Sequence, residues 1–319
     1  MSPHSAFNAV FNGRRRVPAP VNEPVRSYAP GSSERQSLKA RLAAMAGEQI
    51  DIPLVIGGRY IMTADTTAAV MPHDHAHVLG RSARATSDHV RQAVHAAAEA
   101  HHEWSSWAFE DRAAVFLKAA ELLTTTWRDT LNAATMLGQS KTAFQAEIDS
   151  ACELIDFWRF NAHFAQELLE EQPISDRSMW NQLEFRALEG FVFAVTPFNF
   201  TSIAGNLPTA PALMGNTVIW KPAASAMFSA HYLMALLEAS GLPPGVINLI
   251  AGDAGTISGE LLAHRDLTGV HFTGSTGVFN DMWKTIGASM ANYRSYPRIV
   301  GETGGKDFIV AHPSADVAA

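Results

Sequence analysis

Residues 191–222 read FVFAVTPFNFTSIAGNLPTAPALMGNTVIWKP, and this stretch decides the fold. Its two apolar runs, 191–195 and 217–220, stop at Thr196-Pro197 and Lys221-Pro222, and proline rarely continues a central strand. Similar runs recur at 246–250, 270–272, 298–300 and 308–310, and helical segments are expected near 225–240, 256–263 and 276–291. This alternation predicts an α/β fold built on a parallel sheet, whose ligands lie at the carboxyl ends of the strands.

The preceding half of the chain is expected to be mainly helical. Residues 1–40 contain several prolines and the run Gly31-Ser32-Ser33, so they are predicted to form an arm. Apolar residues at mostly helical spacing in 143–170 predict a long helix that Pro173 stops. Polar residues 174–190 are expected to form a β-hairpin or an exposed extension. The other elements predicted here are helices at 34–47, 88–104 (capped by Ser87) and 109–127, a strand at 52–56 and a loop at 72–77.

Composition limits the class of protein. With 47% hydrophobic and 17% charged residues among 319, the chain can form a large core of roughly two domains. A net charge of −7 without a basic stripe argues against nucleic-acid binding, and no apolar run reaches the roughly 18 residues that a membrane span needs. The single cysteine, Cys152, cannot form an intramolecular disulfide, which favours a reducing compartment.

Asn199 lies between two phenylalanines at the tip of the strand that Pro197 ends. Its side-chain N–H could donate to an oxygen that becomes negatively charged, which acyl chemistry requires. A second interpretation stays open, in which Asn199 only caps the helix that follows.

Lys221 ends an apolar strand, where an ammonium group needs an anionic or hydroxylated partner. A ribose hydroxyl or a phosphate of a nucleotide would serve. The alternative is a solvated lysine at the edge of a loop.

Residues 272–276 join a strand to a helix and carry Gly274, which allows a tight turn, and Ser275 at the position of an N-cap. Exposed amides and the helix dipole there would favour an anion such as a pyrophosphate. Gly252 and Gly255, in the preceding strand-to-helix turn, either support this site or only turn the chain.

Glu302 is flanked by Gly301 and Thr303-Gly304-Gly305-Lys306 after another short strand. A carboxylate in such a turn is a candidate general base. The alternative is a turn with an incidental glutamate.

Three further features carry less weight. His73, His75 and His77 suggest a metal site, but no distant ligand set completes it, so no metal is expected. Cys152 lies in the apolar stripe of the long helix and is expected to be a packed core thiol. Glu147, earlier on that helix, is either a solvated charge or a group that recognises a cationic substrate.

The order and spacing of these strand-end motifs resemble those of the aldehyde dehydrogenase superfamily. The resemblance runs from near Asn22 to Val317, almost the whole chain. The motifs that carry it are Pro197-Phe198-Asn199-Phe200, Trp220-Lys221-Pro222, Phe272-Thr273-Gly274-Ser275 and Gly301-Glu302-Thr303-Gly304-Gly305-Lys306. Further stretches, among them Gln145-Ala146-Glu147-Ile148-Asp149, are similar to the branch that oxidises glutamate γ-semialdehyde to glutamate with NAD in proline catabolism.

The resemblance implies a Rossmann-type NAD-binding core at 191–300, preceded by a helical part at 41–173. It also implies that 174–190 is an oligomerisation hairpin, that 301–319 is the first strand of a second, catalytic α/β domain, and that the enzyme is a homo-oligomer, such as a dimer. The implied site residues are Asn199 as oxyanion donor, Glu302 as general base, Thr196, Pro197, Lys221, Gly252, Gly274 and Ser275 around NAD, and Phe200 and Glu147 facing the aldehyde.

Three departures qualify the resemblance. The family's nucleophilic cysteine follows the position of Glu302 by a few tens of residues, so this chain is expected to lack it and to be inactive alone. Ala224 stands where many relatives carry an acid, which weakens the discrimination between NAD and NADP. Phe279 stands where many relatives have glycine, so the phosphate turn is expected to close differently.

These observations leave three hypotheses. The first is an NAD-dependent aldehyde dehydrogenase represented by a truncated chain, cytoplasmic, or in the mitochondrial matrix if the source is eukaryotic. The second is a non-catalytic protein that binds NAD or a partner chain. The third is an α/β fragment without retained function.

Overall fold

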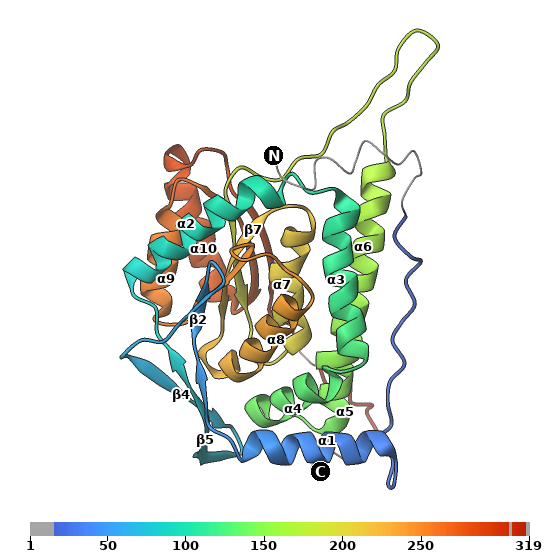
Figure 1. The fold of residues 1–319 in the computed structure, drawn as a ribbon, viewed down its shortest axis with the longest axis vertical. Coiled ribbons are helices and arrows are strands. Elements are labelled where there is room, and N and C mark those ends of the chain that lie inside the picture. Colours follow the sequence, from blue (N-terminus) through green and yellow to red (C-terminus); the bar gives the residue numbers. More distant parts are fainter. Residues whose placement is uncertain (1–15, 306–307, 317–319) are drawn as a thin grey trace.

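The computed structural model describes residues 16–305 and 308–316. At its centre is a seven-stranded sheet with the order β10-β9-β6-β7-β8-β2-β3 (Figure 1). The strands from β10 to β8 are parallel, and β2 pairs antiparallel with β8 and β3. The bounds are β2 Leu54–Ile56, β3 Arg59–Ile61, β6 Phe191–Thr196, β7 Thr217–Pro222, β8 Ile247–Leu249, β9 Leu267–Gly274 and β10 Arg298–Thr303. The predicted α/β fold with a parallel sheet is confirmed.

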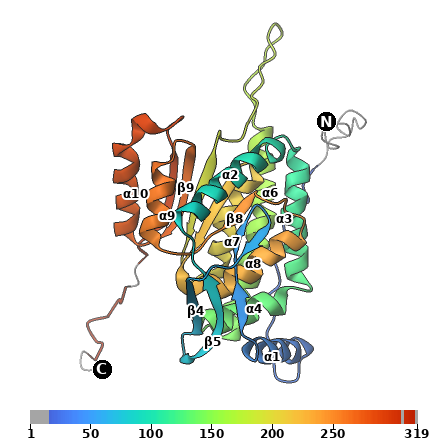
Figure 2. The same cartoon turned by 60° about the vertical axis from the view of Figure 1, so that its left-hand side comes forward.

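Helices cover both faces of this sheet (Figures 1 and 2). Helix α7 (Thr201–Leu213) packs on one face with α8 (Met227–Ala239) beside it, and α2 (Ser87–Trp104), α9 (Ala254–Ala263) and α10 (Thr276–Ala288) lie on the other. An outer layer packs against α7 and α8. It consists of α3 (Phe109–Thr124), α4 (Arg128–Gln139) and α6 (Leu154–Glu170), with α1 (Ser33–Ala46) against α4.

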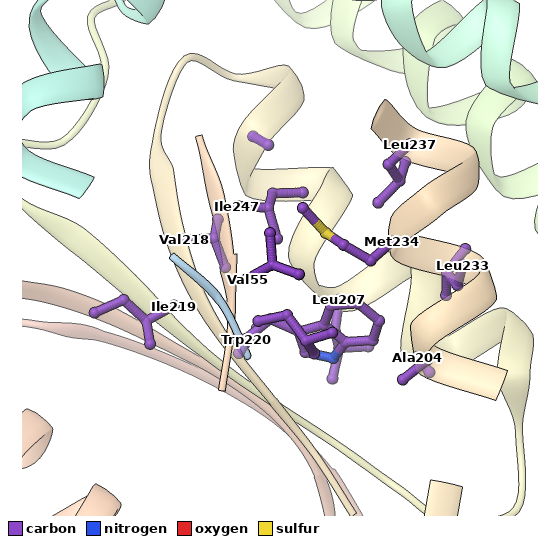
Figure 3. Packing of buried hydrophobic residues seen from close by; sticks show 14 of the residues in the cluster. Val55, Ala204, Leu207, Val218, Ile219, Trp220, Leu233, Met234, Leu237 and Ile247 are labelled. Carbon is purple, nitrogen blue, oxygen red and sulfur yellow. The ribbon is translucent and has the colours of Figure 1, made fainter. Parts of the chain in front are cut away.

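The core lies between the central strand β7 and the helices beside it. All six residues of β7 are buried, which is the pattern of a strand covered on both faces. Trp220 packs towards Leu207 of α7 and Met234 of α8, whereas Ile219 points to the opposite face (Figure 3). The indole N–H of Trp220 donates to Thr196 Oγ1 at 2.9 Å, which ties the ends of β6 and β7 together.

The N-terminal region corrects two predictions. Pro53 splits the single strand predicted at 52–56 into β1 (Ile50–Ile52), which belongs to a second, small sheet, and β2 of the main sheet. The loop predicted at 72–77 is wrong for 74–77, because only 72–73 form the turn and β5 (Asp74–Ala83) then pairs antiparallel with β4 (Thr66–Met71).

The helices of the first half differ from the prediction in detail. Thr86, not Ser87, is the N-cap of α2, and α4 was not predicted. The helix expected at 143–170 is present, but it consists of α5 (Ala143–Ala146), a π-helix η1 (Glu147–Glu153) and α6. The wider π-turn changes which side chains face the core, and it thereby sets the orientation of Glu147 and Glu153.

Residues 171–190 leave the body and return to it as a long exposed excursion (Figure 1). No strand is assigned within these residues, so of the two forms expected for 174–190 the extension is observed. Gln172 Oε1 accepts from the Leu183 amide at 2.7 Å and links the two legs. The excursion exposes the apolar side chains of Ile174, Met179, Trp180, Leu183 and Phe185.

Strand β10 pairs with β9 as far as Thr303. The prediction that residues 301–319 open a second domain is therefore wrong for 301–303, which belong to the main sheet. The strand predicted at 308–310 is also wrong, because residues 308–316 contain none. Lys306 of the glycine-rich motif and Val317 lie outside the described residues.

Two glycines with free space around them test how backbone conformation sets stability. An added Cβ would meet nothing within 4 Å at Gly259, inside α9, or at Gly241, just after α8. We expect Gly259→Ala to stabilise the chain by about 0.5–1 kcal/mol, because alanine is the better helix former. Gly241 has φ +96°, so Gly241→Ala is expected to cost about 1 kcal/mol. Urea unfolding of both variants measures the two changes in the free energy of unfolding, which should have opposite signs. Changes of the same sign would contradict the prediction.

Candidate active site

The carboxyl ends of β6, β7, β9 and β10 enclose a cavity of about 870 Å³. Most of the predicted site residues line it, although they come from four separate strand ends. They are Thr196, Pro197, Asn199, Phe200, Lys221, Gly274, Ser275 and Glu302. The structure thus brings together the residues for which the sequence predicted a shared site, with the exception of Gly252 and Glu147.

Asn199 lies exposed in the wall of this cavity, directly before α7. The amides that open α7 are held by Asp149, whose two carboxylate oxygens accept from Thr201 N at 3.1 Å and Ser202 N at 3.0 Å. Because Asp149 caps the helix, the interpretation of Asn199 as its cap is not what the structure has. The Asn199 amide is left to face the cavity.

Lys221 is 9% exposed, so the alternative of a solvated lysine is wrong. Its Nζ donates to the Pro222 carbonyl at 3.4 Å. Burial lowers the pKa of Lys221 below its ordinary value, and the charge of Asp253 partly opposes this. A buried ammonium with one long hydrogen bond fits a hydroxylated or anionic ligand in the cavity.

Ser275 is the N-cap of α10, where its Oγ accepts from the Val278 amide at 3.4 Å. The first turn of α10 thus points its amides and its positive dipole end at the cavity, as an anion site requires. Gly274 serves a different purpose from the predicted tight turn. A Cβ there would lie 2.7 Å from the ring of Phe272, so the glycine makes room for that ring.

Glu302 is exposed on β10 and lies opposite Thr273 of β9. Thr273 Oγ1 donates to Glu302 Oε2 at 3.3 Å. This hydrogen bond orients the carboxylate at the edge of the cavity, within reach of solvent.

Glu147 does not face the cavity, so the prediction that it contacts substrate is wrong. It is fully buried, and its carboxylate accepts from the Arg26 amide at 2.8 Å, Tyr28 Oη at 2.7 Å, Asn132 Nδ2 at 2.9 Å and the Arg128 guanidinium. These partners occupy both carboxylate oxygens. Glu147 therefore fastens the N-terminal segment to the π-helix.

Gly252 is likewise not part of this cavity. It has φ +147°, and a Cβ would lie 3.0 Å from the Ala85 amide nitrogen. The residue turns the chain where it passes β5, which is the structural alternative that the sequence left open.

The sequence assigned no role to Asp149, Glu153 or Ser202. None of the three lines the cavity, but they are hydrogen-bonded to one another just after its residue Phe200. Ser202 Oγ approaches Asp149 Oδ1 at 2.8 Å and Glu153 Oε2 at 2.7 Å. Burial, the largest cause, and the charges of Asp149 and Glu302 raise the pKa of Glu153 against its hydrogen bond from Ser202. Glu153, not Glu147, is thus the carboxylate of this helix whose pKa is affected by the charge of Glu302. A carboxylate one residue after a buried cysteine was the only signal in the sequence.

The remaining candidates have other surroundings. Cys152 is 5% exposed, and burial, followed by the charge of Glu147, raises its pKa to about 12, so it is a packed thiol. His73 and His77 bond separately to Ser140 Oγ and the Ala46 carbonyl. Among residues 16–305 and 308–316, no group of three or more His, Cys, Asp or Glu side chains could hold a metal ion. No helix in that part of the chain is long and apolar enough to cross a membrane.

The sequence profile of the aldehyde dehydrogenase family matches residues 60–319, and the chain belongs to that family. Within it, the chain is similar to delta-1-pyrroline-5-carboxylate dehydrogenases. It is 47% identical to the mitochondrial enzyme of Dictyostelium discoideum over an aligned region of 307 residues. That region covers 95% of this chain and 55% of the relative. The human mitochondrial enzyme is 43% identical over 297 residues, 93% of this chain and 53% of the relative.

Solved structures agree with these sequence matches. The delta-pyrroline-5-carboxylate dehydrogenase of Mycobacterium tuberculosis superimposes with a TM-score of 0.93 at 56% identity, over 96% of this chain and 57% of the other. A structure of that enzyme bound with NAD matches equally well. The chain thus spans about half the length of the relatives it matches.

Proposed function

We propose that the chain binds NAD in the strand-end cavity and forms part of an enzyme that oxidises L-glutamate γ-semialdehyde, the open form of 1-pyrroline-5-carboxylate, to L-glutamate. The observation that carries the proposal is Lys221, a buried ammonium with one long hydrogen bond that lines the same cavity as the N-terminus of α10. A dinucleotide needs both features, one for a ribose hydroxyl and one for the pyrophosphate.

Each of the cavity residues would have a separate role in binding or catalysis. Lys221 would hold the adenosine ribose, and the amides of the α10 first turn would hold the pyrophosphate. NAD, when bound, supplies the acceptor for the hydride that leaves the aldehyde carbon. The Asn199 amide would donate to the aldehyde oxygen as a nucleophile adds to the carbonyl carbon and the electron pair of the C=O bond moves to that oxygen. Phe200 would pack on the aliphatic part of the substrate.

Glu302 would take a proton from the water that completes the oxidation to the acid. Its hydrogen bond from Thr273 keeps the carboxylate at the cavity edge. Cys152, the one cysteine of the sequence, does not line the cavity, so the steps proposed for this chain are binding, oxyanion stabilisation and proton transfer.

We also propose that the excursion at 171–190 contacts a second copy of the chain. Its side chains include Ile174, which is 90% exposed, and Trp180, which is 87% exposed. Apolar groups gathered on a projecting segment are typical of a protein interface.

Lys221→Met tests the nucleotide proposal. Removing a charge-assisted hydrogen bond from a buried site is expected to weaken NAD binding at least about tenfold in calorimetry of the 319-residue chain. Lys284→Met is the matched control, because Lys284 is exposed on α10 and pairs with Asp281. Unchanged NAD affinity in Lys221→Met would contradict the proposal.

A further inference from the structure

Asp149 is a buried carboxylate that joins the π-helix to the start of α7. It is 3% exposed and lies in η1, more than 50 residues before its partners in the chain. Besides the amides of Thr201 and Ser202, it accepts from Lys141 Nζ at 2.6 Å. Both carboxylate oxygens thus accept from the segment that follows the candidate oxyanion donor, and one of them also accepts from Lys141.

Lys141 contacts the same segment through Phe200. Its Nζ lies 4.1 Å from the centroid of the Phe200 ring, so one ammonium contacts both Asp149 and the aromatic residue next to Asn199. Phe200 has no side-chain hydrogen bond of its own to cap α7, although it is the N-cap residue. Asp149 and Lys141, which are themselves ion-paired, therefore form one clamp that contacts residues 200–202.

We propose that Asp149 is a positioning residue that keeps Asn199 directed into the cavity, at the end of the dinucleotide site where hydride transfer takes place. The inference rests on the proposed function. Asparagine is among the best helix-capping residues, and the first amides of α7 need an acceptor. Asn199 lies one residue before the N-cap residue Phe200, which has no side-chain acceptor, so without Asp149 the Asn199 side chain would turn from the cavity towards those amides.

The geometry also indicates which half of NAD would bind more weakly after the loss of Asp149. Lys221 lies at the end of β7, whereas residues 197–200 follow the end of β6, and all of them line one cavity. The Lys221 ammonium bonds to the Pro222 carbonyl, whereas the Lys141 ammonium bonds to Asp149. Displacing residues 197–200 should weaken contacts to the nicotinamide half and leave the adenosine half bound. A purely structural aspartate would affect both halves alike.

The experiment compares NAD with AMP, which occupies only the adenosine half, by calorimetry on the 319-residue chain. We expect Asp149→Ala to weaken NAD about tenfold and to change AMP less than twofold. Asp176→Ala is the control, because Asp176 makes the same type of contact to Ser178 N, at 2.7 Å, in the exposed excursion. It should change neither affinity.

Lys141→Met keeps the helix cap and removes the contact to Phe200, so it tests the clamp even if Asp149→Ala does not fold. It should weaken NAD severalfold, again without loss of AMP. Equal effects on NAD and AMP, or no effect in either variant, would overturn the inference while leaving the proposed function intact. A wild-type chain that binds neither nucleotide would overturn both.

Discussion

Replacing Arg128 with methionine is expected to lower the free energy of unfolding by about 3–5 kcal/mol. The guanidinium is 1% exposed and pairs with the buried carboxylates of Glu23 and Glu147. It also donates to the Pro24 carbonyl at 2.9 Å. Methionine fills similar space but leaves Glu147 without a cation, whereas Glu23 keeps its ion pair with Arg159 at 2.9 Å. The uncompensated charge of Glu147 is the origin of the cost.

The pH dependence of this loss gives a sharper test than its size. Burial, the largest cause, would raise the pKa of Glu147, but hydrogen bonds from Arg128, the Arg26 amide and Tyr28 outweigh it and hold the pKa below its ordinary value. The stability contributed by Glu147 in the wild-type chain is therefore complete above that ordinary value and is lost as the pH falls through the folded-state pKa.

In Arg128→Met the burial remains and the cation is gone, so the pKa of Glu147 should rise above its ordinary value. As the pH falls, Glu147 of the variant is protonated and the cost of its buried charge is removed. The difference in the free energy of unfolding between wild type and variant should therefore become smaller between pH 7 and about 4.5. Urea unfolding at several pH values measures this. Arg91→Met, which removes an exposed guanidinium, is the control and should show no such trend. A difference independent of pH would contradict the assignment of the cost to Glu147.

The strand-end cavity was predictable because each of its parts is encoded locally. An apolar run, a proline or glycine and one polar residue mark where a strand ends, and the parallel sheet then brings those ends together. Lys221, Ser275 and Glu302 each follow that pattern. No long-range information beyond the alternation of strands and helices was needed to group them.

The errors lie where the backbone departs from regular periods or where a partner is distant in the chain. Glu147 and Glu153 begin and end the π-helix, and its wider turn breaks the 3.6-residue period by which their faces would be predicted. Asp149 caps a helix that begins 52 residues later, and nothing near Asn199 in the sequence shows that its capping role is already filled. The polar run at 74–77 was mistaken for a loop because only pairing with β4 makes it a strand.

Phe279 of α10 packs directly against the backbone of Gly301 on β10. A Cβ at position 301 would lie 2.3 Å from the Phe279 ring. That ring stacks on Phe272 with centroids 5.4 Å apart and meets Trp283 edge-on at 6.4 Å, so it cannot move aside without losing both contacts. We expect Gly301→Ala to destabilise the chain by about 2–3 kcal/mol in urea unfolding, as overpacking of a fixed site does.

A double-mutant cycle separates this clash from a simple strand effect. Phe279→Ala removes the ring, so Gly301→Ala made in that background should cost less than about 0.5 kcal/mol, a coupling of about 2 kcal/mol. Gly277→Ala, also on α10 but with no atom within 4 Å of its added Cβ, should cost nothing comparable. Additive costs for Gly301→Ala and Phe279→Ala would show that the ring does not set the requirement for glycine. Coupled costs would mean that the aromatic residue on α10 and the glycine beside Glu302 form one packing unit, so that the phosphate turn and the candidate general base are positioned together.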